Sequence, residues 1–252
     1  MSTHPLLPKL RQLKLSGMLQ TLEVRAAQAT ERQLSPVEFF ALLLDDELER
    51  RNQQHLVRSL ALSGCDSLKT LAQFDFLAAP GVNRTLIQDL STCTFIPRHE
   101  NILLCGPSGV GKSHLANALA IEALKRDFRV VSKPTHRLLS DLHAARANGA
   151  HLRLLNRILH CDLLVLDDFG LQALPPQAVQ DLYEIITERY ERGSLIVTSN
   201  RAFEEWPEVF NNDLLASAAL DRLTHHAHTL TIRGDSFRQR NRRKEVLPIL
   251  PG

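Results

Sequence analysis

Apolar residues in the first part of the chain recur at the spacing of amphipathic helices. Within residues 6–29 the recurring apolar positions are Leu6, Leu10, Leu13, Met18 and Leu22. This spacing predicts one helix with an apolar face. A second helix is predicted to begin after Ser35, because Ser35 suits the N-cap, Pro36 suits the first helical position and Glu38 completes a capping box. Residues 80–90, PGVNRTLIQDL, predict a further short helix.

From about Ile96 onward the pattern changes to short aliphatic runs separated by helical segments. The five runs are NILLC, RVVSK, DLLVLDD, SLIVTS and HTLTI, and two helices are expected between the second and the third. Near-continuous aliphatic strands joined by helices predict an α/β fold with a mostly parallel sheet that is covered on both faces. Ligands bind such sheets at the carboxyl ends of the strands, so the residues after each strand are the candidates for chemistry.

The first aliphatic run leads into GPSGVGKS, a full match to the phosphate-loop pattern GxxxxGK[ST]. Its glycines let successive backbone N–H groups point at phosphates. Lys112 brings an ammonium to the β- and γ-phosphates, Ser113 offers a hydroxyl to Mg²⁺, and the helix that follows adds its dipole. The predicted nucleotide-binding residues are Gly106, Pro107, Ser108, Gly109, Val110, Gly111, Lys112, Ser113 and His114. The His114 side chain is also expected to pack or hydrogen-bond locally.

Two further strands end in polar side chains. The third run leads into Asp167 and Asp168, and the fourth ends at Asn200. We expect Asp167 to hold the Mg²⁺ shell and Asp168 to act as general base on the attacking water. Asn200 is suited to position that water or to contact the γ-phosphate. Each residue alone also fits an ordinary turn, but their order after a phosphate loop favours a nucleoside triphosphatase site.

Composition and charge narrow the function only slightly. The chain has 252 residues, of which 44% are hydrophobic and 23% are charged, and its net charge is +2. These values are ordinary for a globular protein and do not by themselves indicate a nucleic-acid binder. Six Lys and Arg residues lie between Arg233 and Lys244, with Asp235 as the one acid. This basic run is either a solvated tail or a phosphate-contacting patch.

The cysteines and histidines do not predict a metal site. The four cysteines are scattered without a CxxC pair, which indicates free thiols in a reducing cytosol. The histidines of THHAHT, His225, His226 and His228, lack a matching Cys or acidic pattern, so no metal is expected there. No apolar run approaches the ~20 residues that span a bilayer. Lys9 and Arg11 also interrupt the N-terminal segment, so we expect a cytoplasmic protein without a membrane partner.

The second acid and the separate polar-tipped strand resemble AAA+ ATPases rather than GTPases, because no NKxD motif follows any strand. Longer stretches are similar to the IstB group, the helper ATPases encoded beside the transposase in certain bacterial insertion sequences. The nearest relatives of that group are DnaC-type helicase loaders. The stretches that carry the resemblance are LKLSGMLQTL, SPVEFFALLLDDELERR, DLLVLDDFG, LYEIITERYERGSLIVTSNRAFEEWPEVF and AALDRLTHHAHTLTIRGDSFR. They extend from about Leu6 to Arg238.

This resemblance implies a P-loop AAA+ ATPase core, with a five-stranded parallel sheet between helices, preceded by a small all-α domain. The implied segments are a helical partner-binding domain over 1–70, a helical lead-in over 71–95, the ATPase domain over 96–244 and a tail over 245–252.

The resemblance also implies roles that spacing does not give. Arg222 in AALDRL matches the arginine finger that reaches nucleotide on a neighbouring subunit, and Arg238 in GDSFR matches the second sensor arginine. Related ATPases meet nucleic acid through a helical insertion after the second strand. The basic residues available there for duplex DNA are Lys133, Arg137, Arg146, Arg153 and Arg157. AAA+ proteins generally carry Glu where this chain has Asp168, which favours slow, partner-stimulated hydrolysis.

The function that these patterns favour is an ATP- and Mg²⁺-dependent transposition helper. It is expected to form homo-oligomers on duplex DNA with little sequence preference, to recruit and stimulate the cognate transposase, and to reset on ATP hydrolysis. A DnaC-type replicative helicase loader is the alternative, because it shares the same ATPase residues. A small-molecule phosphotransferase is less favoured, because neither a lid nor an acceptor pocket is recognisable in the sequence.

Overall fold

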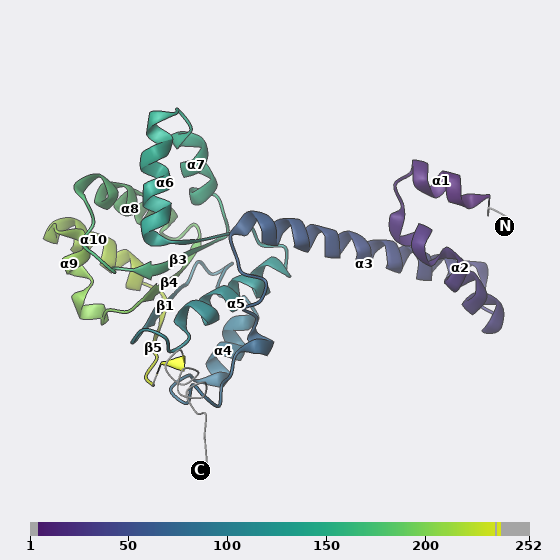
Figure 1. Cartoon of the computed structure of the whole chain (residues 1–252), viewed down its shortest axis with the longest axis horizontal. Helices are drawn as coiled ribbons and strands as arrows, with labels where there is room; N and C mark the ends of the chain where they lie inside the picture. Colours follow the sequence, from purple (N-terminus) through teal and green to yellow (C-terminus); the bar gives the residue numbers. More distant parts are fainter. Residues whose placement is uncertain (1–4, 235, 238–252) are drawn as a thin grey trace, which may run out of the picture. The chain divides into compact units, whose positions relative to one another are not determined.

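The computed structural model describes residues 5–234 and 236–237 (Figure 1). The chain divides into two compact units, Met1–Ser59 and Leu60–Gly252, and the division falls within one long helix. The predicted segment boundaries at residues 70, 95 and 244 stay predictions.

The first unit is helical. Met18 and Leu22 pack against Leu43 in a small core, to which the partly buried Leu10 and Phe39 add apolar surface. Its elements are α1 (Leu6–Gln12), α2 (Ser16–Glu31) and the first part of α3 (Pro36–Ser63).

The single helix predicted over residues 6–29 is wrong, because the chain breaks between α1 and α2. Lys14 has a φ of 57°, in the left-handed region. The break exposes the backbone N–H of Gly17 at the start of α2, and this group donates a 2.6 Å hydrogen bond to Oε2 of Glu47 on α3. Glu47 is only 4% exposed, and Arg51 pairs with its second oxygen at 2.7 Å. An uninterrupted helix has no free N–H at this position, so the buried carboxylate would lose a donor.

The predicted start of α3 is confirmed. The backbone N–H of Ser35 donates to Oε2 of Glu38 at 2.8 Å, and the backbone N–H of Glu38 donates to Oγ of Ser35 at 3.3 Å. These hydrogen bonds lower the pKa of Glu38. The pair satisfies two N–H groups that the first helical turn leaves without partners.

The second unit contains a five-stranded parallel sheet in the order β2-β3-β4-β1-β5, which confirms the predicted α/β fold. The strands are β1 (Asn101–Cys105), β2 (Val130–Pro134), β3 (Leu163–Phe169), β4 (Ser194–Ser199) and β5 (Ala227–Thr231). Because β4 lies between β1 and β3, the carboxyl ends of these three strands are neighbours. The phosphate loop, the two acids and Asn200 are therefore brought to one edge of the sheet.

Helices connect the strands as the pattern predicts. The short helix predicted over 80–90 is α4, capped by Asn83, whose side chain accepts from the N–H of Leu86. The two helices predicted between the second and third strands are α6 and α7. The helical elements of this unit are η1 (Leu71–Gln73), α4 (Arg84–Ser91), α5 (Lys112–Leu124), α6 (Thr135–Ala147), α7 (His151–Leu159), α8 (Pro176–Arg189), η2 (Phe203–Glu205), α9 (Pro207–Phe210) and α10 (Asp213–Thr224).

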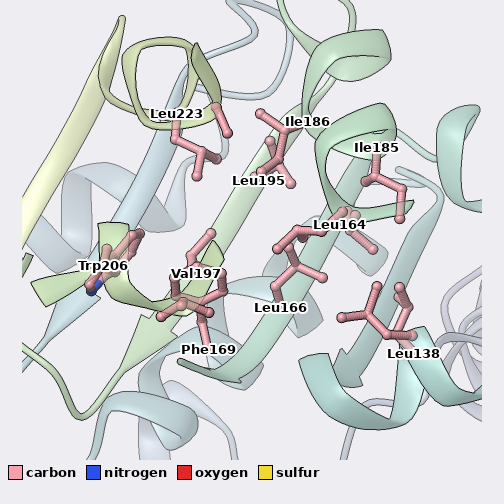
Figure 2. Packing of buried hydrophobic residues seen from close by; sticks show 14 of the residues in the cluster. Leu138, Leu164, Leu166, Phe169, Ile185, Ile186, Leu195, Val197, Trp206 and Leu223 are labelled. Carbon is pink, nitrogen blue, oxygen red and sulfur yellow. The ribbon is translucent and has the colours of Figure 1, made fainter. Parts of the chain in front are cut away.

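Helices cover both faces of the sheet (Figure 1). On one face, alternate side chains such as Leu164 and Leu166 of β3 pack with Leu138 of α6, Ile185 of α8 and Leu223 of α10 (Figure 2). α5 contacts β1, β2, β3 and β4 but contributes no side chain to this cluster, so it covers the opposite face. Each buried aliphatic side chain contributes about 1.5–3 kcal/mol, and burial on both faces explains why the strands read as continuous aliphatic runs.

The four cysteines are free, as the sequence predicts. Burial raises the pKa of the Cys93 and Cys105 thiols to about 11. Within residues 5–234 and 236–237, no helix combines the length and the apolarity needed to cross a membrane.

Candidate nucleotide site

The phosphate loop joins β1 to α5 through a backbone that favours glycine. The φ angles are 145° at Gly106, 84° at Gly109 and 101° at Gly111, values that residues with side chains rarely adopt. α5 begins at Lys112, directly after the last of these glycines. The first N–H groups of α5 and those of the loop therefore lie together at the positive end of the helix dipole, an arrangement that binds anions.

Lys112 places its charge at the centre of this loop, although only 4% of the residue is exposed. Its Nζ donates hydrogen bonds of 2.7 Å to Oδ1 of Asn200 and to two backbone carbonyls of the loop. Burial lowers the pKa of Lys112, whereas the charges of Asp168 and Asp167 raise it. The phosphate loop, the two acids after β3 and Asn200 after β4, which the sequence predicted separately, thus all interact with the Lys112 ammonium.

A pocket with a volume of about 400 Å³ lies beside this ammonium, within the range of small-molecule sites. The predicted residues that line it are Ser108, Gly109, Gly111, Lys112, Ser113, His114, Asp168 and Asn200. Val110 is buried, and Gly106 and Pro107 supply the carbonyls that hold Lys112. The pocket residues that sequence reasoning missed are Lys69, Gln73, Phe74, Asp75, Leu171 and Phe237.

The segment ahead of η1 is fastened to the start of α5 by side-chain hydrogen bonds. Nε2 of His114 lies 2.8 Å from the carbonyl oxygen of Thr70. Nδ2 of Asn117 donates to the carbonyls of Asp66 at 2.8 Å and Lys69 at 3.0 Å. His114 thus forms the kind of hydrogen bond expected of it, but its partner lies 44 positions away, at the end of the segment predicted as the partner-binding domain.

This fastening brings Phe74 against the phosphate loop. A Cβ on Gly111 would lie 2.7 Å from Cε2 of Phe74, and the Phe74 ring is 5.3 Å from the His114 ring. On another side of the pocket, the N–H of Phe237 donates to the carbonyl of Gly109 at 3.0 Å. The aromatic residues of AQFDFL are the one feature of the sequence that could have indicated this side of the pocket. The hydrogen bonds that hold the segment in place are accepted by backbone carbonyls, which follow no fixed residue spacing.

The two predicted acids lie at the end of β3, next to β4. Asp168 has a φ of 53°, and its backbone N–H donates to Oγ1 of Thr198 at 3.0 Å. Oγ1 of Thr198 donates to Oδ1 of Asp167 at 2.5 Å. Asp168 lines the pocket directly.

The oxygen atoms around the pocket fit a Mg²⁺ ion that arrives with nucleotide. Ser113 and Asp168 line the same pocket, and the charges of Asp167 and Asp168 both act on Lys112. Hydroxyl and carboxylate oxygens are the ligands that Mg²⁺ prefers, usually together with phosphate oxygens.

The two arginines implied by the resemblance have different outcomes. Arg222 lies in the last turn of α10, where its Nη1 donates to the carbonyl of Ala218 at 2.6 Å and its Cζ is 6.0 Å from the Tyr183 ring centre. It does not line the described nucleotide pocket of its own chain, and its role on a neighbouring subunit stays a prediction. Arg238 lies outside the described residues.

Of the five basic residues predicted to face DNA, three are held by contacts within the protein. The held residues are Lys133 with Asp141, Arg146 with Asp181, and Arg157 with the carbonyl of Leu62. Arg137 on α6 and Arg153 on α7 are exposed, and neither has an ion pair or side-chain hydrogen bond within the described part of the chain. These two are therefore the side chains available for phosphate.

An acidic residue, Glu191, lies beside two histidines of the THHAHT cluster, although no acid follows from the sequence pattern. The ligand atoms of Glu191, His225 and His226 lie within 4.8 Å of one another, and all three residues are exposed. Nδ1 of His225 lies 2.7 Å from the Tyr190 hydroxyl, while His228 pairs with Glu100. Exposed groups of this kind are common without a metal, and we assign none.

Solved structures share the fold. The DnaC helicase loader superposes with a TM-score of 0.50 and 24% identity, over 59% of this chain and 87% of that one. AMPPCP-bound DnaA from Aquifex aeolicus gives a TM-score of 0.58 and 20% identity, over 72% of this chain and 55% of that one. At these identities the likeness shows that the chain shares the α/β fold of these proteins, which agrees with the fold that the resemblance implied.

Sequence relatives identify the family. A predicted ATP-binding protein of insertion sequence IS21 from Pseudomonas aeruginosa is 36% identical over 241 residues, 96% of this chain and 91% of that protein. The corresponding protein of insertion sequence IS5376 from Geobacillus stearothermophilus is 35% identical over 231 residues, 92% of each chain. The family model described as IstB-like ATP binding protein matches residues 8–245. The chain therefore belongs to the IstB-like ATP binding protein family.

Proposed function

We propose that the protein is a Mg²⁺-dependent ATPase that assembles on duplex DNA and recruits and stimulates the transposase of its insertion sequence. Slow hydrolysis then resets the assembly. The observation that carries this proposal is that Lys112, Asn200 and Asp168 line one pocket, with the charge of Asp167 also acting on Lys112, in a protein of this family. ATP binding follows from the family, and the further steps rest on the residues below.

Hydrolysis is divided among three side chains in this proposal. Lys112 exchanges its loop carbonyls for oxygens of the β- and γ-phosphates, Asn200 orients the attacking water, and Asp168 accepts its proton. Ser113 and Asp167 would hold a Mg²⁺ ion that arrives with ATP, and the ion would neutralise charge on the phosphates. Asp168 is one methylene shorter than the Glu that resembling ATPases carry, so we expect slow turnover until a partner closes the site.

Assembly and hydrolysis are coupled through Arg222 in this proposal. The Arg222 guanidinium does not line the described nucleotide pocket of its own chain, and in this proposal it acts on a neighbouring subunit. Arginine fingers supplied in trans contribute about 10³–10⁵-fold in rate. Isolated monomers are therefore expected to hydrolyse ATP very slowly, and a homo-oligomer is the active form.

DNA binding is assigned to the exposed side of α6 and α7, with Arg137 and Arg153 as the leading phosphate contacts. Residues 133–160 contain no Phe, Tyr or Trp, which argues against base stacking as the source of affinity. Contacts from Arg and Lys to phosphate carry no sequence information, so we expect duplex binding with little sequence preference and strong salt dependence.

Transposase recruitment is assigned to the helical first unit. Along α3 the apolar side chains of Val37, Phe40, Leu44 and Leu48 are exposed at helical spacing. An apolar stripe on a helix is a common docking surface for proteins, and the insertion-sequence relatives make the transposase the expected partner. A cytoplasmic location, with access to DNA and ATP, belongs to the same proposal.

A comparison of the wild type with Lys112→Ala tests this function. ATP and a non-hydrolysable analogue are added with and without duplex DNA, and the particle mass and ATPase rate are measured. We expect wild-type protein to form large ATP-dependent particles on DNA and to hydrolyse ATP faster there. Nucleotide-independent particles, or ATP-dependent particles formed by Lys112→Ala, would contradict the proposed switch. Capture of a replicative helicase instead of the transposase by the first unit would favour a helicase loader.

A further inference from the structure

The sheet has an irregularity where β3 ends. Leu166 pairs with Val197 and Phe169 pairs with Ser199, so two residues of β3 lie opposite one residue of β4. The two are Asp167 and Asp168, and the single residue opposite them is Thr198. Two residues opposite one, with Asp168 on the two-residue side in the left-handed region, is the arrangement of a β-bulge.

The hydroxyl of Thr198 fills the hydrogen-bonding gap that the bulge creates. It accepts from the backbone N–H of Asp168 at 3.0 Å and donates to Oδ1 of Asp167 at 2.5 Å. Thr198 is fully buried, at 0% exposure. One hydroxyl therefore satisfies both the amide that the bulge removes from the ladder and one carboxylate oxygen of the neighbouring acid.

The bulge changes where the second acid points. In a regular strand, successive side chains point to opposite faces of the sheet. Asp168 instead adopts a φ of 53° and lines the nucleotide pocket, while Asp167 is held from β4. Ser199 secures the far side of the bulge, because its hydroxyl donates to the carbonyl of Phe169 at 2.8 Å.

We propose that Thr198 is a positioning residue that orients the carboxylate of Asp167 toward the nucleotide-bound Mg²⁺ and fixes the turn that aims Asp168 at the pocket. Thr198 does not line the pocket and acts only through the two acids. This inference rests on the proposed Mg²⁺-dependent hydrolysis. Under this proposal, a buried residue of β4, two positions before Asn200, helps to set the geometry of the nucleotide site.

The decisive variants are Thr198→Val, which keeps the shape and removes the hydroxyl, and Thr198→Ser, which keeps the hydroxyl. The measurements are the binding of a fluorescent ATP analogue as Mg²⁺ is titrated, the same binding in EDTA, and the ATPase rate. We expect T198V to need about 10–100-fold more Mg²⁺ and to lose hydrolysis by a similar factor, as is usual when a partner of a metal ligand is removed. Binding in EDTA should stay within about twofold, because the phosphate loop is intact. T198S should restore both properties.

Thr135 provides a matched control. It is also buried, and its hydroxyl donates to the same Asp167, but to the backbone carbonyl, at 3.0 Å. We expect Thr135→Val to leave the Mg²⁺ requirement within about twofold of wild type, because the carboxylate keeps its own donor. An equal shift in T135V would overturn the proposal, because it would show a general disturbance of the β3 end.

Other outcomes are also decisive. An unchanged Mg²⁺ requirement in T198V would overturn the proposal. The proposal would also fail if T198S kept the melting temperature of the wild type but needed as much Mg²⁺ and hydrolysed ATP as slowly as T198V. If T198V does not fold, Thr198→Cys replaces it, because a thiol is a weaker donor and acceptor; an unchanged Mg²⁺ requirement there would have the same meaning. Should wild-type protein bind Mg²⁺–nucleotide without hydrolysing it, the proposed function fails, while a shifted requirement in T198V still supports the positioning role.

Discussion

Nζ of Lys112 donates a 2.7 Å hydrogen bond to Oδ1 of Asn200, across 88 positions of sequence. The same two segments also meet through the backbone, because the N–H of Gly106 donates to the carbonyl of Ser199 at 3.2 Å. The end of β4 is thus fixed to the phosphate loop by a side chain and by the main chain. The amide therefore holds a defined position relative to the lysine on which phosphate binding depends.

Asn200→Ala should separate binding from hydrolysis. The phosphate loop and Lys112 remain, so we expect nucleotide affinity to change by less than about fivefold. The attacking water loses its positioning group, so the ATPase rate should fall by about 100-fold, the scale of a small misplacement at a reacting centre. Rate and affinity are measured on the same preparation. Asn156→Ala, at an exposed site on α7, is the control, and an Asn200→Ala rate equal to that of the control would refute the role.

A methyl group at Gly111 should abolish nucleotide binding. Its Cβ would lie 2.7 Å from Cε2 of Phe74, and the backbone φ of 101° is already unfavourable for a residue with a side chain. Gly149 is a matched site, because it has a φ of 72° and no heavy atom lies within 4 Å of the position that its methyl group would take. We expect Gly149→Ala to cost about 1–2 kcal/mol of stability through backbone strain alone and to bind nucleotide normally. Titration with a fluorescent ATP analogue and thermal melting distinguish the two, and normal binding by Gly111→Ala would exclude the Phe74 contact as a constraint.

The sheet and the phosphate loop were predictable because their signals are local. The runs NILLC and SLIVTS match β1 and β4 residue for residue, since a parallel strand covered on both faces is rich in aliphatic residues. The glycines of the loop follow from positive φ angles, which few other residues tolerate. The carboxyl ends of parallel strands lie at one edge of the sheet, so the polar residues that follow the first, third and fourth strands could be placed together.

What the sequence did not reveal depends on contacts between distant segments. Arg189 looks like a surface residue on a helix, yet its exposure is 0% and its guanidinium donates to the carbonyls of Ile158, Cys161 and Ser194, each at 2.8 Å. The acceptors are backbone oxygens, which every residue carries, so no residue pattern marks them. The hydrogen bonds from Asn117 to the carbonyls of Asp66 and Lys69 were hidden for the same reason. The β3 bulge was hidden because it depends on the pairing of Asp167 and Asp168 with Thr198 of another strand.

The basic residues of α6 and α7 should divide into two classes. Arg153→Ala should weaken binding to duplex DNA similarly for all sequences and should reduce the salt dependence by about one phosphate contact. Arg146→Ala should instead lower the melting temperature, because Asp181 is only 3% exposed and would lose the guanidinium that donates to it at 2.7 Å. Among the described residues, Asp181 would keep only the 3.4 Å hydrogen bond from Nε2 of Gln177, and the loss of the charged partner of a buried carboxylate costs about 1–3 kcal/mol or more. Binding is measured by fluorescence anisotropy at several salt concentrations, and an Arg153→Ala variant with an unchanged salt slope would remove Arg153 from the interface.

Mixing two inactive variants tests whether Arg222 acts on a neighbouring subunit. Arg222→Ala keeps Lys112 but lacks the finger, so its ATPase rate should fall by about 10³-fold while its nucleotide affinity stays near wild type. Lys112→Ala keeps the finger but lacks the phosphate-binding ammonium. In a mixture of equal amounts, about a quarter of head-to-tail interfaces combine an intact Lys112 with an intact Arg222 from the next subunit, so activity should reappear on DNA. A finger that works within its own chain gives no such recovery, because neither variant carries both groups. Arg222→Lys, which keeps the charge but not the forked guanidinium, should remain slow in the absence of a partner variant.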